Sequence, residues 1–179
     1  MKKENRQVTD IILRYLLILL STFNGFFVFY FLMTPLTVIF SSLIIDLFYD
    51  AIISGNNLMV QGVSINIVDS CVAGAAYFLL FFLNMSIPNI KLSRRFEMIL
   101  VSFSILLLAN VLRIFFLTFW LVRGYANFEL IHNFLWHFVS IAFVLIIWFG
   151  EVKFYKINKF PGYSDIKFIF SKSLLKKWL

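Results

Sequence analysis

The stretch MILVSFSILLLANVLRIFFLTFWLV, residues 98–122, decides the fold of this chain. It is longer than the roughly 20 residues that an α-helix needs to cross a bilayer core about 30 Å thick. Its one charged residue is Arg113, which lies well inside the stretch. A charged arginine in a membrane helix costs roughly 3 kcal/mol on insertion scales, and it is rarely kept there without a role. The stretch therefore predicts a transmembrane helix in which Arg113 carries out a task.

The composition extends this prediction to the whole chain. Of its 179 residues, 61% are hydrophobic and 14% are charged, whereas a soluble domain is closer to half apolar and about a quarter charged. The net charge of +7 does not indicate a nucleic-acid partner, because the basic residues are grouped in particular loops. One cysteine excludes an intrachain disulfide. The residues form no Cys/His cluster suited to a metal, and we expect no cofactor.

Three further runs are apolar enough to cross a membrane, namely residues 11–33, 71–87 and 131–149. A fifth run, residues 36–53, follows Pro35 and has polar residues at roughly helical spacing, namely Ser41, Ser42, Asp46 and Asp50. This pattern favours an amphipathic helix that lies at the surface or re-enters the membrane. We therefore expect an all-α polytopic membrane protein, one domain over residues 1–179, with four transmembrane helices.

The basic residues predict the orientation. They gather before the first run, in the 88–96 loop and after the fourth run, and none lies between Arg14 and Lys91. The positive-inside rule places the amino terminus, the 88–96 loop and a basic amphipathic tail, residues 153–179, in the cytoplasm of a multi-pass cell-membrane protein. Both termini inside require an even number of crossings. The alternative is that residues 36–53 form a fifth span and the amino terminus lies outside.

Residues 54–70 are then extracytoplasmic. Ser54-Gly55-Asn56-Asn57 is typical of a turn, and residues 58–68 alternate loosely around Gly62 with several β-branched side chains. The pattern predicts a short β-hairpin.

Three chemically capable residues fall at one predicted depth. Arg113 lies sixteen residues after Glu97, which is about 24 Å at 1.5 Å per residue. Cys71 and His132 each lie in the first turn of a run that starts outside. All three should therefore meet near the extracytoplasmic boundary, on three different helices.

These residue types suit acyl transfer from a peptide bond through a thioester. Cys71 would be the nucleophile, His132 the base that takes its proton, and Arg113 the group that stabilises a thiolate, an oxyanion or a substrate carboxylate. Asn110 shares a helix face with Arg113 and would orient the guanidinium. Gly74 would allow a close helix approach near the thiol. Trp136, four residues after His132, would wall the pocket.

Each of these residues also has a structural interpretation. A lone cysteine in an apolar helix is often a small buried hydrophobe, an arginine can snorkel, and His132 can anchor a helix end. His137 competes with His132, but it lies five residues later, more than one turn away, and points to a different side of the helix.

Three motifs, in order, carry a resemblance to a known family. They are Val68-Asp69-Ser70-Cys71-Val72-Ala73-Gly74, Asn110-Val111-Leu112-Arg113-Ile114 and His132-Asn133-Phe134-Leu135-Trp136. Over roughly residues 36–150 the chain resembles the exosortase/archaeosortase family of membrane cysteine transpeptidases. Its short length and its ending, Phe160-Pro161-Gly162-Tyr163-Ser164-Asp165-Ile166-Lys167, are most similar to the small archaeal branch called pacearchaeosortase.

The resemblance implies an enzyme that processes exported proteins bearing a carboxy-terminal signal, which consists of a short motif, an apolar helix and a basic tail. It also implies that Cys71 is the nucleophile, Arg113 the stabiliser and His132 the third catalytic residue. Many relatives have serine or threonine directly after the cysteine and glycine next, whereas Val72 and Ala73 precede Gly74 here. The last position varies in the family between histidine and arginine.

Two other functions are weighed against this one. A non-catalytic membrane subunit or scaffold would use the large apolar helix faces. A small transporter or channel would need polar residues along a complete path, and the inner halves of residues 71–87, 98–122 and 131–149 are nearly all apolar.

Overall fold

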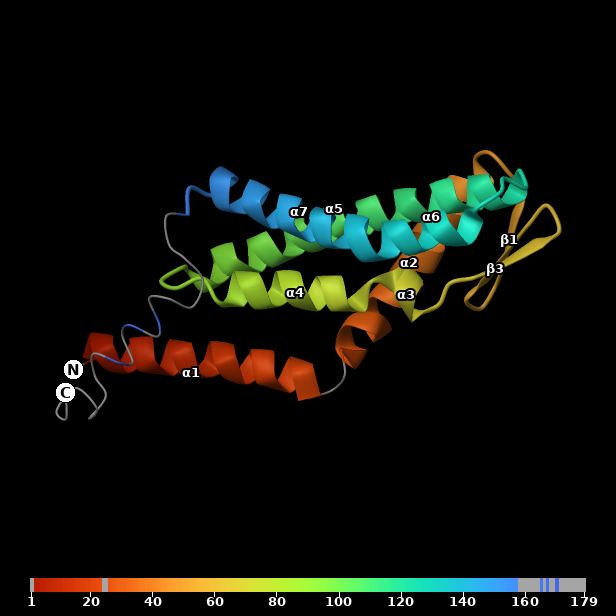
Figure 1. Cartoon of the computed structure of the whole chain (residues 1–179). Helices are drawn as coiled ribbons and strands as arrows, with labels where there is room; N and C mark the ends of the chain where they lie inside the picture. The colour runs from red at the N-terminus through yellow and green to blue at the C-terminus, as the bar shows by residue number, and fades with distance from the viewer. Residues whose placement is uncertain (1, 24–25, 158–164, 166, 168–169, 171–179) are drawn as a thin grey trace.

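The computed structural model describes residues 2–23, 26–157, 165, 167 and 170. This part of the chain is mostly helical, as expected, and carries one small sheet (Figure 1). In chain order the elements are α1 (Lys2–Phe23), α2 (Phe27–Asp46), β1 (Ala51–Ser54), β2 (Asn57–Val60), β3 (Val63–Asn66), α3 (Asp69–Val72), α4 (Gly74–Met85), α5 (Leu92–Val122), α6 (Phe128–Phe134), the π-helical turn η1 (Leu135–Val139) and α7 (Ser140–Phe154). Most of the predicted tail, residues 153–179, lies outside the described residues.

The helices lie side by side along one long axis (Figure 1). The start of α1, the α4–α5 loop and the end of α7 lie at one end, which we call the basic end because Lys91, Arg94 and Lys156 lie there. The sheet and the α5–α6 turn lie at the opposite end, the sheet end. The loops that the charge pattern groups together are therefore grouped in space.

Three helices in the described residues are long and apolar enough to cross a membrane: α2, α5 and the continuous helix Phe128–Phe154 formed by α6, η1 and α7. Their outer faces expose large hydrophobic side chains, including Phe31, Phe116, Ile146 and Phe149. Such faces are costly in water and suit lipid. Helix α4 is also apolar, but it has only 12 residues.

The predicted first span, residues 11–33, is not one helix in the structure. Helix α1 ends at Phe23, and α2 begins after Phe26, whose φ of 62° is left-handed and interrupts the helical path. Asn24-Gly25 is a sequence that favours a helix end, but the apolar pattern on both sides of it conceals the break.

The predicted amphipathic helix over residues 36–53 is also divided. Its first part continues α2 without interruption through Pro35, and Ala51–Ser54 is strand β1. The polar positions Ser41 and Ser42 are buried against other helices rather than turned to water. Small polar residues mediate helix packing in membranes as often as they mark a water-facing stripe, and this explains the difference.

The predicted hairpin is present as β2 and β3, and β1 extends it to a three-stranded antiparallel sheet in the order β1-β2-β3. A two-residue turn at Gln61-Gly62 joins β2 to β3, and both residues have positive φ. This is the backbone that a tight hairpin of type I′ requires.

Two arginines at the basic end cap the last turn of α4. Arg95 is fully buried and donates to the carbonyl oxygens of Asn84, Met85 and Ile87 at 2.7, 2.7 and 2.9 Å. Arg14 donates to Met85 and also pairs with Asp165 at 2.9 Å. The carbonyls at a helix end have no partner within the helix, so these guanidinium groups satisfy them inside the protein.

Candidate active site

Cys71 lies on a helix that is interrupted directly after it. Helix α3 is one turn long, and Ala73, with φ 62°, separates it from α4. A left-handed alanine costs roughly 1 kcal/mol or more. The interruption leaves the carbonyl oxygens of Ser70 and Cys71 without the usual helical donors.

Arg113 and Asn110 of α5 supply the missing donors. Asn110 Nδ2 donates to the Cys71 carbonyl at 2.7 Å, and Arg113 Nη2 donates to the Ser70 and Cys71 carbonyls at 3.2 and 3.1 Å. Both side chains are buried. The predicted neighbourhood of Cys71, Asn110 and Arg113 is therefore present, and it is fixed through backbone oxygens.

The same guanidinium reaches the continuous helix Phe128–Phe154. Arg113 Nη1 donates to Ser140 Oγ at 2.9 Å, and Ser140 directly follows the π turn η1. Turns of this kind are rare and recur at functional sites. Arg113 thus joins the break after Cys71 to the helix that carries His132.

Cys71 and His132 line one cavity of about 200 Å³ at the sheet end. Its walls come from β3, α5 and α6 and are mostly apolar, with Ile114, Leu117, Leu121 and Phe128 among them. Arg113 does not line the cavity, but its Nη2 donates to the backbone carbonyl of Cys71 at 3.1 Å. Chain segments far apart in the sequence therefore place Cys71 and His132 at one cavity and Arg113 against the Cys71 backbone.

Among the described residues no hydrogen bond joins Cys71 to His132. Hydrogen bonds between catalytic groups often tighten only when substrate is bound. Two buried donors of α5 have no hydrogen-bond partner in the described residues, namely Arg113 Nε and Thr118 Oγ1, and of these two residues only Thr118 lines the cavity. Thr118 Oγ1 can therefore bond a polar group that enters the cavity.

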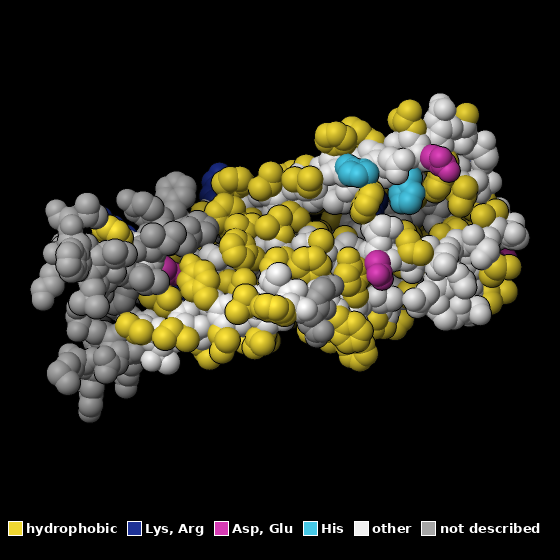
Figure 2. All heavy atoms as spheres, turned by 60° about the horizontal axis from the view of Figure 1, so that its bottom comes forward, with side chains coloured by type: hydrophobic (Ala, Val, Ile, Leu, Met, Phe, Trp, Pro, Cys, Tyr) yellow, Lys and Arg dark blue, Asp and Glu magenta, His cyan; other side chains and the backbone are white. Residues whose placement is uncertain are grey.

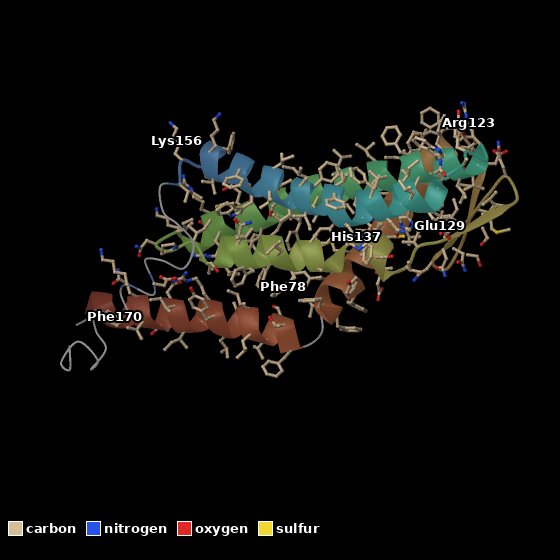
Figure 3. The ribbon with its side chains drawn as sticks, viewed as in Figure 1. Phe78, Arg123, Glu129, His137, Lys156 and Phe170 are labelled. Carbon is tan, nitrogen blue, oxygen red and sulfur yellow. The ribbon has the colours of Figure 1, made fainter. Side chains whose placement is uncertain are left out.

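Both histidines of the chain are visible on one face of the molecule (Figure 2), but they have different surroundings. His132 is half-buried at the cavity, beside the ring of Phe128. His137 is exposed, its Nδ1 contacts the carbonyl of Asn133 at 2.9 Å, and its ring packs on Trp136. Figure 3 shows His137 on η1, farther from the sheet than Glu129. Trp136, which the sequence predicts to wall the pocket, is not among the residues that line this cavity. Its ring packs against His137 instead.

Gly74 permits the close helix approach that the sequence predicts. A Cβ placed on Gly74 would lie 2.6 Å from ring carbons Cε1 and Cζ of Tyr30 on α2. No side chain fits this contact unless the tyrosine ring moves. The glycine thus holds the start of α4, just after Cys71, against α2.

We expect Gly74→Ala to destabilise the protein by about 1–3 kcal/mol, because overpacking displaces the Tyr30 ring. Gly150→Ala is the matched control, since a Cβ at that helical glycine meets nothing within 4 Å and gains up to about 1 kcal/mol of helix propensity. Thermal unfolding in detergent measures both. If Gly74→Ala costs as much in a Tyr30→Ala background as in the native one, the contact is not the cause.

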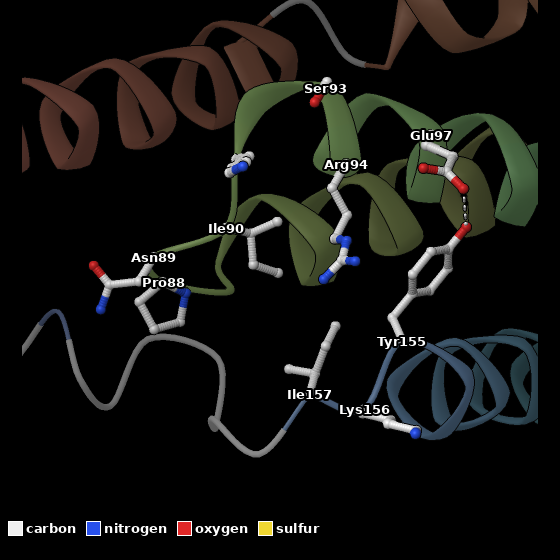
Figure 4. A pocket seen from close by; sticks show the side chains of 10 residues that line it. Pro88, Asn89, Ile90, Ser93, Arg94, Glu97, Tyr155, Lys156 and Ile157 are labelled. Carbon is white, nitrogen blue, oxygen red and sulfur yellow. Dashed lines mark hydrogen bonds between the residues drawn. The ribbon is translucent and has the colours of Figure 1, made fainter.

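A larger, open cavity of about 680 Å³ lies at the basic end, between the α4–α5 loop and the end of α7 (Figure 4). Tyr155 Oη donates to Glu97 there at 3.0 Å. Arg94, Lys91 and Lys156 also line it. It lies at the end of the molecule opposite to Cys71.

Two residues of the candidate site were not predicted. Ser140 is an ordinary helical serine in the sequence, whereas in the structure it directly follows the π turn and accepts a hydrogen bond from Arg113. Thr118 lies five residues after Arg113, and its spacing alone gives no signal.

The chain matches none of the protein-family models, curated proteins or solved structures with which it was compared.

Proposed function

We propose that the chain is a membrane cysteine peptidase or transpeptidase that cleaves carboxy-terminal sorting signals of exported proteins through a thioester. The observation that carries the proposal is the cavity that Cys71 and His132 share. Arg113 donates a hydrogen bond to the backbone carbonyl of Cys71 beside it. In this proposal α1 and α2 together make the first crossing, and α3–α4, α5 and Phe128–Phe154 make the other three. The basic end is cytoplasmic, and the sheet end lies at the outer face.

The steps follow from the groups present. His132 takes the proton of the Cys71 thiol, and the sulfur forms a bond to the scissile carbonyl carbon, whose π electrons move to oxygen. Arg113, through its unpartnered Nε–H, stabilises this oxyanion. When the tetrahedral intermediate collapses, the C–N bond breaks and His132 returns the proton to the leaving amine. Water or an amine then attacks the thioester and releases Cys71.

A non-catalytic membrane subunit is the second candidate. Its specific support is that, in the described residues, the hydrogen bonds of Arg113 and Asn110 all satisfy groups of the protein itself, namely backbone carbonyls and Ser140. Such bonds stabilise the fold whether or not chemistry takes place. In that case Cys71 is a packing residue, and His132 makes no difference to its reactivity.

Alkylation of the single cysteine separates the two candidates. We expect iodoacetamide to alkylate Cys71 about tenfold more slowly in His132→Ala than in the native protein, because the variant lacks the base that takes the thiol proton as the sulfur attacks. His137→Ala is the matched control and should leave the rate unchanged, since His137 lies outside the cavity. Mass spectrometry of the peptide that contains Cys71 gives the rates. Labelling of intact cells with a membrane-impermeant maleimide shows from which side of the membrane Cys71 is accessible. Equal rates in all three proteins would favour the subunit.

A further inference from the structure

Strand β3 has a free edge beside the candidate nucleophile. The sheet order is β1-β2-β3, so β3 pairs with β2 on one side and with no described strand on the other. Ile67 N donates toward β2, to the carbonyl of Asn56 at 2.9 Å. Because backbone groups alternate along an antiparallel strand, Ser64 and Asn66 direct their N–H and C=O groups to the free edge.

This edge borders the cavity that holds Cys71 and His132. Ser64 and Asn66 both line it, together with Ile65 and Ile67. No hydrogen bond in the described part of the chain uses the outward backbone groups of these two residues. An unpaired strand edge is a template for another extended chain.

A second observation points to a polar ligand in the same cavity. Thr118, on the α5 wall, is 2% exposed, and its Oγ1 has no partner among the described residues. Ser102 and Ser104 on the same helix instead donate to the carbonyl four residues earlier. A buried hydroxyl without a partner costs roughly 1–3 kcal/mol, and a peptide carbonyl entering the cavity would remove that cost.

We propose that an extended segment of the substrate polypeptide binds as a fourth strand on the free edge of β3, between this edge and α5, and so presents its carbonyl to Cys71. The identity of the segment as substrate rests on the proposed function. Backbone hydrogen bonds to Ser64 and Asn66 give affinity, as in other cases of strand addition. The cavity is small, about 200 Å³, and its walls are mostly apolar, so the segment has small apolar side chains.

The test uses the full chain with Cys71→Ala in lipid nanodiscs, so that binding is separated from reaction. The probe is an acetylated Val-Ala-Val-Ala amide that carries a photoreactive diazirine. We expect saturable crosslinking to the walls of the cavity. The same peptide N-methylated at every amide should crosslink at least about tenfold less, because it cannot donate to the strand edge.

Proline substitutions test the edge from the side of the protein. Asn66→Pro removes an outward N–H from β3 and should lower crosslinking about tenfold, whereas edge positions tolerate proline in the fold. Ile53→Pro is the matched control, since by its register it removes an outward N–H from the opposite edge, on β1. Thermal unfolding checks that each variant folds, and the N-methylated peptide tests the native edge without any mutation.

Equal crosslinking by the plain and N-methylated peptides would overturn the proposal, and so would an absence of saturable crosslinking. The outcome is independent of the proposed chemistry. Crosslinking that follows the expected pattern, together with a Cys71 whose alkylation is indifferent to His132, keeps the docking edge and removes the enzyme. If instead the plain and N-methylated peptides crosslink equally while alkylation of Cys71 depends on His132, Cys71 remains the candidate nucleophile and the free edge of β3 is not the binding site.

Discussion

Replacing Cys71 with alanine is expected to abolish processing of a reporter whose carboxy terminus carries a short motif, an apolar helix and a basic tail. No other cysteine exists in the chain to replace the thiol. Loss of the nucleophile from a set of groups that act together costs several orders of magnitude in rate. Co-expression of enzyme and reporter, followed by the mass of the reporter in the membrane fraction, measures the loss.

Cys71→Ser refines this expectation. Serine is nearly isosteric and keeps the backbone carbonyl that Arg113 and Asn110 hold, but its hydroxyl is a far weaker nucleophile at neutral pH. Processing should therefore fall strongly while thermal stability stays near that of the native protein. Full processing by both Cys71→Ala and Cys71→Ser would remove Cys71 from the chemistry and favour the subunit.

Replacing Arg113 with methionine is expected to destabilise the protein by about 3 kcal/mol or more and to abolish processing. The change removes donors to Ser70, Cys71 and Ser140, and each buried acceptor left without a partner costs roughly 1–3 kcal/mol. Unfolding in detergent measures the stability. Arg123→Met is the matched control, because Arg123 is exposed. Its guanidinium stacks on the ring of Phe119 at 4.1 Å and interacts with Tyr49 and Tyr125 at the surface, where water can replace the lost contacts.

Arg113→Lys separates the structural role from the chemical one. Lysine keeps the charge and can bond one of the carbonyls, but it has no planar fork and no Nε–H beside it. We expect stability to recover in part and processing to remain low. If Arg113→Lys restores processing in full, then the Nε–H donor has no part in the reaction.

The sequence was a good guide where a residue is conspicuous against its surroundings. Arg113 in an apolar helix, Cys71 as the one thiol, and His132 at the start of a run are all visible in this way. In the structure Cys71 and His132 line one cavity, and Arg113 donates to the Cys71 carbonyl. Gly74 was predicted from its size alone, and its contact with Tyr30 follows from the same property.

The rest depended on backbone geometry that side-chain patterns do not reveal. The partners of Arg95 and Arg113 are carbonyl oxygens, which every residue has, and they become acceptors only because helices stop at Met85 and at Val72. The left-handed conformations of Phe26 and Ala73 occur at residues that do not favour them, so neither helix break was expected at its place. Ser41 and Ser42 gave a wrong prediction for a related reason. A polar stripe on a helix has the same sequence pattern whether it faces water or a neighbouring helix.

The π turn between α6 and α7 has a consequence for comparing this chain with others. Its bonds close over five residues instead of four, so the turn takes in one amino acid more than an α-helical turn does. A protein of the same fold with an unbroken α-helix there would place the counterpart of His132 one position nearer to that of Ser140. An alignment across residues 135–139 should therefore permit a gap of one residue. Without that gap, His132 would be aligned with a residue that is not its structural counterpart.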